Sequence, residues 1–119
     1  MEEKMNTKQG SLNISEEVIR TIITRSVSEF KGVEIAVEEA AALKKFFIVN
    51  DEGSIRINLD NDVVAIGLRI SVNAGYNVID LTENLQKKIK RDIQNMTGIT
   101  VSGVNIQVDD IIFEENRAV

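Results

Sequence analysis

Apolar side chains recur at steps of three and four residues in the stretch after Ser15, which predicts an amphipathic helix. Ser15 is a good N-cap, and Glu16 and Glu17 follow in the first turn, where the helix dipole favours acids. Gly32 is placed to end this helix in a left-handed conformation. The apolar stripe consists of Val18, Ile19, Ile22, Ile23, Val27 and Phe30.

A second stripe of the same period predicts a longer helix, of about 20 residues and about 30 Å. Asn77 and Asp80 have the spacing of an N-cap and an acidic partner three residues later. Gly98 follows the last apolar position and is expected to stop the helix. The stripe consists of Val78, Leu81, Leu85, Ile89, Ile93 and Met96.

Between the two predicted helices, apolar and polar residues alternate, which predicts strands. Two such runs flank Asp60-Asn61-Asp62, a sequence typical of turns, and so predict a hairpin with one apolar face. The apolar face carries Ile55, Ile57, Leu59, Val64, Ile66, Leu68, Ile70 and Val72. The opposite, water-facing side carries Arg56, Asn58, Arg69 and Ser71.

A last strand is expected after Gly98, with Val104, Ile106 and Val108 on one face and polar residues on the other. Residues 33–49 are ambiguous: the start alternates as a strand does, EEAAALKK favours a short helix, and FFIV fits either. The predicted fold is α+β, a two-layer α/β sandwich in the order α, variable segment, β, β, α, β. Its helices cover one face of a small, mainly antiparallel sheet. We expect a disordered arm at 1–10, one domain at 11–113 and a frayed tail at 114–119.

The amino-acid composition excludes several kinds of functional site. A chain of 119 residues fits one domain, and the absence of Cys and His excludes disulfides, the usual zinc sites, thiol nucleophiles and histidine triads. No apolar run approaches the roughly 20 residues of a membrane span, and the polar N-terminus is unlike a signal peptide. The net charge of -5 argues against free-standing DNA or RNA binding. We expect no enzyme, no cofactor, and a cytoplasmic location.

Gly98 and Gly103 have the glycine spacing of a phosphate-binding loop. Such a loop needs Lys and then Ser or Thr after its second glycine, and here Val104 and Asn105 follow. It also leads from a strand into a helix, whereas this stretch leads from a helix into a strand. We therefore predict a helix stop at Gly98, and at Gly103 a bulge or a close backbone approach.

Clustered carboxylates do not predict a metal site. Asp109 and Asp110 are adjacent on a strand and so point to opposite faces, which favours a charged strand end over converging ligands. Asp60 and Asp62 are explained by turn chemistry. Tyr76 is expected to pack at a turn, and no spacing assembles catalytic groups.

One cluster of positive charge stands out on this acidic chain: Lys87, Lys88, Lys90 and Arg91. One interpretation is a solvated helix face, partly paired through Glu83 and Lys87. The other is a docking surface for an acidic partner, anionic lipid headgroups or RNA.

Two stretches resemble the alkaline-shock, Gls-type envelope stress protein family. They are GSLNISEEVIRTIITRSVSEFKGV and DNDVVAIGLRISVNAGYNVIDLTENLQKKIKRDIQNMTGITVSGVNIQVDDI, of which MTG and Val104-Asn105 are the most specific parts. The resemblance covers roughly residues 10–112. The chain departs from the family at Ala74, where an aromatic residue is usual, and across 34–50.

The resemblance implies a Gram-positive bacterial protein that acts in cell-envelope stress and homeostasis without catalysis. It implies a scaffold or adaptor that works through protein contacts, with a membrane-anchored partner and self-association as known in some members. Such a protein would be cytoplasmic, or peripheral at the membrane through its partner. The alternative function is an RNA-binding module that uses the basic cluster.

Overall fold

The computed structural model describes residues 6–7, 10–11, 13–36 and 53–113. The elements expected at 37–49 and the frayed tail at 114–119 lie outside these residues. Strands β1 and β2 pair with each other near the N-terminus, within and just beyond the segment predicted as a disordered arm. In chain order the elements are β1 (Asn6–Thr7), β2 (Gly10–Ser11), α1 (Glu16–Ser28), β3 (Val33–Ile35), β4 (Ile55–Asp60), β5 (Val63–Asn73), α3 (Val78–Thr97) and β6 (Thr100–Ile112).

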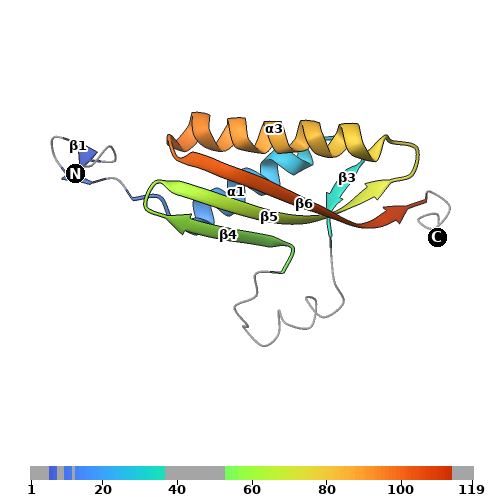
Figure 1. Cartoon of the computed structure of the whole chain (residues 1–119), viewed down its shortest axis with the longest axis horizontal. Helices are drawn as coiled ribbons and strands as arrows, with labels where there is room; N and C mark the ends of the chain where they lie inside the picture. The colour runs from blue at the N-terminus through green and yellow to red at the C-terminus, as the bar shows by residue number, and fades with distance from the viewer. Residues whose placement is uncertain (1–5, 8–9, 12, 37–52, 114–119) are drawn as a thin grey trace.

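The α+β two-layer sandwich is confirmed, with both helices on one face of a four-stranded sheet (Figure 1). Strand β5 is central. Strands β4 and β3 pair antiparallel with it, β4 along its first half and β3 along its second. Strand β6 runs parallel to β5 over its whole length, because α3 carries the chain back across the helical face between them.

Helix α1 begins as predicted, with the Ser15 Oγ accepting a hydrogen bond from the Val18 amide at 3.4 Å. It ends at Ser28, earlier than predicted, so Gly32 is not its cap. Gly32 lies in the following turn with φ of 87°. A Cβ there would be 2.7 Å from the Tyr76 ring, so the glycine makes room for that ring. The prediction that Tyr76 packs at a turn is confirmed.

Helix α3 is bounded as predicted. The Asn77 side chain accepts a hydrogen bond from the Asp80 amide at 3.0 Å, and Gly98 ends the helix in the left-handed conformation, with φ of 79°. Two residues of the predicted stripes are exposed, in the terminal turns of their helices: Val18 by 43% and Met96 by 66%. At Met96 the prediction fails because Ile99, directly after the helix, is buried and occupies the core at this end.

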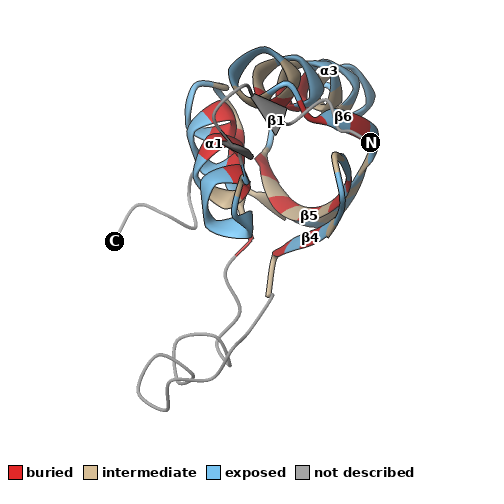
Figure 2. Ribbon diagram, turned by 90° about the vertical axis from the view of Figure 1, so that its left-hand side faces the viewer, coloured by how far each residue is buried: buried red, intermediate tan, exposed pale blue. Residues whose placement is uncertain are grey.

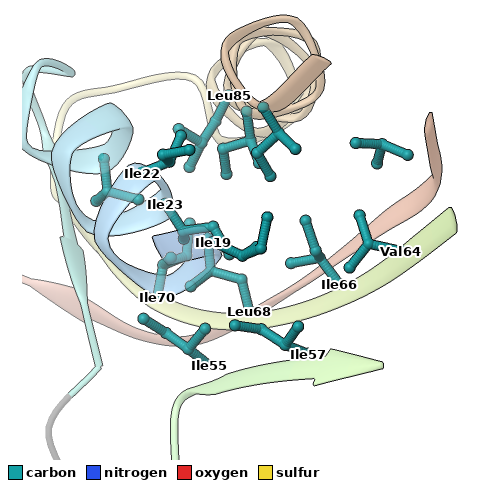
Figure 3. Packing of buried hydrophobic residues seen from close by; sticks show 14 of the residues in the cluster. Ile19, Ile22, Ile23, Ile55, Ile57, Val64, Ile66, Leu68, Ile70 and Leu85 are labelled. Atoms are coloured by element: carbon teal, nitrogen blue, oxygen red, sulfur yellow. The ribbon is translucent and has the colours of Figure 1, made fainter. Parts of the chain in front are cut away.

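The core lies between the helices and the sheet, and it is almost entirely aliphatic (Figure 3). Alternate residues of β5 are buried, and each helix adds its stripe, as the periodicities predict. The fully buried side chains are Ile19, Ile23, Leu68, Ile70, Leu85, Ile89, Ile93, Ile99, Val64, Val72 and Ser26.

Two bulges interrupt the pairing of β5 with β6. Val64 lies opposite Val101 but Ala65 lies opposite Gly103, so Ser102 is the extra residue. The pairing shifts again at Asp109, between Val108 and Asp110. The predicted bulge at Gly103 is thus confirmed, whereas the close backbone approach is wrong, since a Cβ there would meet nothing within 4 Å.

Candidate interaction surfaces

A polar cluster joins α1 to α3 beside the aliphatic core. The Lys88 ammonium lies 2.7 Å from a Glu29 carboxylate oxygen and 3.2 Å from one of Asp92. The Ser26 hydroxyl lies 2.7 Å from the Asp92 carboxylate and donates to it or to the Ile22 carbonyl. Ser26 is the one fully buried polar residue in the described part of the chain. The cluster therefore ties the two helices together in a fixed register.

The cluster shifts the protonation of its members. The hydrogen bond from Lys88 lowers the pKa of Glu29, and the hydrogen bonds to Glu29 and Asp92 raise the pKa of Lys88. Burial alone would raise the pKa of Asp92, but hydrogen bonds from Ser26 and Lys88 outweigh it and the pKa is lowered. All three side chains are therefore charged at neutral pH.

The four predicted docking residues consequently separate into two groups. Lys88 faces α1, its side chain is only 18% exposed, and both its partners are anionic. Lys87, Lys90 and Arg91 are exposed on the outer side of α3. Within the described residues no ion pair joins Lys87 to Glu83, so the pairing considered for the sequence is absent there. The four-residue spacing of Lys88 and Asp92 already suggests their ion pair in the sequence. The contact of Lys88 with Glu29 cannot be seen there, because it depends on the packing of α3 against α1.

Buried residues alternate with exposed or intermediate ones along β4 and β5 (Figure 2). The side chains on the face opposite the helices are mostly polar, as predicted. No described element covers this face. On this face the Arg69 guanidinium binds the Asp109 carboxylate, with Nε at 2.8 Å, and Gln107 donates to the same carboxylate at 2.8 Å. The hydrogen bonds from Arg69 and then Gln107 lower the pKa of Asp109. This pair fixes the side chains at the end of the face near the second bulge.

A depression of about 80 Å³ lies in the middle of this face. Its floor is Gly67 of the central strand, and the flanking strands place Arg56 and Asn105 directly on either side. The other described residues that line it are Gly53, Ser54, Leu68, Arg69 and Gln107, and none of these carries a carboxylate. A glycine inside a strand pattern is the sequence signal for such a feature. Only the strand register shows what stands beside it.

The depression suits an anionic or carbonyl oxygen. Arg56 is exposed and has no ion pair within the described residues, so its guanidinium is available to a ligand. The side chains of Asn105 and Gln107 add amide donors and acceptors. In residues 13–36 and 53–113 no group of three or more acidic side chains could hold a metal ion. No helix in the described part of the chain is long and apolar enough to span a membrane.

Comparison with known proteins agrees with the resemblance seen in the sequence. The model of the alkaline-shock protein family, which is described as having a cell envelope-related function, matches residues 4–113. Among curated proteins, the chain is similar to YqhY of Bacillus subtilis, with 27% identity over 92% of this chain and 82% of that protein. It is also similar to Spy1614 of Streptococcus pyogenes, with 24% identity over 91% of this chain and 93% of that protein. Both relatives are named as uncharacterized proteins.

Solved structures with a similar fold come from metal-related proteins. The metal-bound C-terminal domain of the CzcD transporter from Thermotoga maritima aligns with a TM-score of 0.52 and 17% identity, over 83% of this chain and 94% of that chain. The copper form of a MamM C-terminal-domain variant aligns at 0.50 and 8% identity, over 81% of this chain and 98% of that chain. At such low identity the likeness shows the fold alone.

Proposed function

Because the chain belongs to the alkaline-shock protein family, whose function is cell envelope-related, we propose that it is a non-enzymatic adaptor that uses the open sheet face to bind a protein partner. The observation that carries the proposal is the polar face around Gly67, which is uncovered in the described structure although it spans the centre of the sheet. The partner would present a carboxylate or an extended backbone to Arg56 and Asn105. Such a surface offers recognition without any arrangement of catalytic groups.

The chemistry of the face supports a protein ligand. Arg56 can hold a carboxylate bidentately, and the flanking amides match the donors and acceptors of a peptide backbone. The chain as a whole is acidic, with a net charge of -5, yet the described residues that line the depression include two arginines and no carboxylate. An acidic segment is therefore attracted to this depression although the chain as a whole is negatively charged, and the exposed basic residues of α3 are the competing site.

In-cell photo-cross-linking tests this proposal. A photoreactive residue at Ala65, exposed on the sheet face, should cross-link a protein of the envelope fraction. The same residue at Thr24, exposed on α1, should not. Gly67→Leu should abolish the product because it fills the depression. A Cβ at position 67 meets only the Arg56 side chain, at 3.6 Å, so its first carbon is accommodated; thermal melting checks that the variant folds.

The basic residues of α3 supply the competing outcome. If changing Lys87, Lys90 and Arg91 to Glu abolishes the cross-link while Gly67→Leu leaves it intact, the partner uses α3 and the sheet-face proposal is wrong. A cross-linked product that ribonuclease removes would favour RNA binding instead. RNA affinity would also fall steeply with salt, by about 0.7 log units per log unit of salt for each phosphate contact.

A further inference from the structure

Strand β6 forms one whole edge of the sheet. It has 13 residues, it pairs with β5 on one side only, and no described strand pairs with its other side. Natural proteins shield such edges with charges and bulges, because a free edge is a template for another strand. Here the bulges at Ser102 and Asp109 and the charges at Asp109 and Asp110 lie at the ends. Five of the residues between the bulges, 104–108, pair regularly with β5 and are uncharged.

The register determines which backbone groups point outward. In a parallel pair only alternate residues of a strand bond to its neighbour. The Val104 carbonyl accepts a hydrogen bond from Gln86 of α3 at 3.0 Å, so it points away from β5. Because inward and outward residues alternate, the backbone groups of Ile106 and Val108 also point away from β5. Three residues therefore direct their amide and carbonyl groups to the open side.

The free segment reads alike in both directions. Residues 104–108 are Val-Asn-Ile-Gln-Val, with an aliphatic residue at each end and in the middle and an amide between them. We propose that two copies of this chain pair through β6, antiparallel, with Ile106 of one copy opposite Ile106 of the other. The two sheets would then join into one of eight strands about a twofold axis.

This register is self-complementary on both faces. Val104 falls opposite Val108 of the second copy, on the helical side, where both are only partly buried in the single chain. Asn105 falls opposite Gln107 of the second copy, on the polar side. Asp109 falls opposite Gly103, and Asp110 opposite Ser102, so the aspartates avoid one another. Like charges directly opposite would destabilise the pair, and the sequence places none there.

The backbone can complete the pairing. Residues 104, 106 and 108 would form about six hydrogen bonds with the second copy, two for each opposed pair. The Val104 carbonyl has two lone pairs and can keep its bond to Gln86 while it accepts a second donor. Pairing at the edge leaves the outer sheet face open, so this inference does not rest on the proposed adaptor function.

A charge exchange tests both the dimer and its register. In the proposed pairing, the double variant Asn105→Lys with Gln107→Lys places one ammonium group opposite another at both 105–107 contacts. Its dimer dissociation constant should rise about tenfold. Asn105→Lys with Gln107→Glu changes the same positions but opposes unlike charges, and should restore the dimer. Both positions are exposed, so neither variant disturbs the core. Sedimentation equilibrium over the micromolar range gives the dissociation constants.

Cysteine pairing provides a second measurement, because the chain has no cysteine of its own. A mixture of Asn105→Cys and Gln107→Cys copies should form a disulfide dimer under mild oxidation, since these residues face each other across the axis. Each variant alone should form much less, because its own cysteines are offset along the strands. A wild-type chain that is monomeric throughout, or a dimer that the double lysine variant leaves unchanged, would overturn the proposal.

Discussion

The turn at Gly98 allows a sharp test of how backbone conformation contributes to stability. Gly98 has φ of 79°, in the left-handed region, and a Cβ built on it meets nothing within 4 Å. A substitution by Ala therefore costs backbone strain and no steric clash. That strain is about 1–2 kcal/mol for an L-residue in this region.

Gly103 is the matched control. It lies in β6, a Cβ there also meets nothing within 4 Å, and its φ is not in the left-handed region. Both Gly→Ala changes stabilise by about 0.4–1 kcal/mol, because they restrict the unfolded chain. This contribution cancels in the comparison. Gly98→Ala should therefore be less stable than Gly103→Ala by about 1–2 kcal/mol, the strain alone.

Thermal unfolding followed by circular dichroism measures the difference. For a chain of this size, 1 kcal/mol corresponds to a change in Tm of about 4 °C, so the two variants should differ by about 4–8 °C. All proteins must be compared at one concentration, because self-association would raise Tm. Gly98→Asn should melt between Gly98→Ala and the wild type, since Asn tolerates the left-handed region better than Ala. Equal melting of the two Ala variants would refute the account of this helix stop.

Two further predictions concern the helices. Lys88→Met should destabilise the protein at neutral pH, and Lys87→Met should not, because of these two lysines Lys88 alone bonds to Glu29 and Asp92. The pKa values of Glu29 and Asp92 are lowered in the folded protein. The stabilisation is therefore complete above pH 4.5, the ordinary pKa of Glu29, and is lost as the pH falls through the lowered values. The raised pKa of Lys88 preserves it up to at least its ordinary value of 10.5. Urea unfolding from pH 3 to pH 9 checks this, and a stability difference that persists undiminished at the acid end would contradict it. Ile89→Ala should cost about 2–5 kcal/mol because the side chain is fully buried, whereas Met96→Ala, on an exposed residue, should stay within about 0.5 kcal/mol in the same assay. Similar losses of stability for both variants would mean that Met96 belongs to the core.

Local features were determined by the sequence itself. Ser15 and Asn77 begin helices, and Gly98 ends one, because capping depends on side chains and backbone groups within a few residues of one another. The hairpin likewise follows from alternation around a two-residue turn, in which Asn61 adopts a positive φ of 58°. The helical and strand periods also identified most of the core and the polar sheet face.

Tertiary structure decided what depends on distant parts of the chain. Four neighbouring cations in the sequence form one cluster, yet packing of α3 against α1 turns Lys88 towards Glu29 and leaves the other three exposed. Gly67 is an ordinary strand glycine until the register places Arg56 and Asn105 beside it. The free edge of β6 exists because α3 carries that strand to the outer side of β5. Short-range interactions fix helices and turns, whereas the arrangement of charges and open edges follows only from how those elements pack.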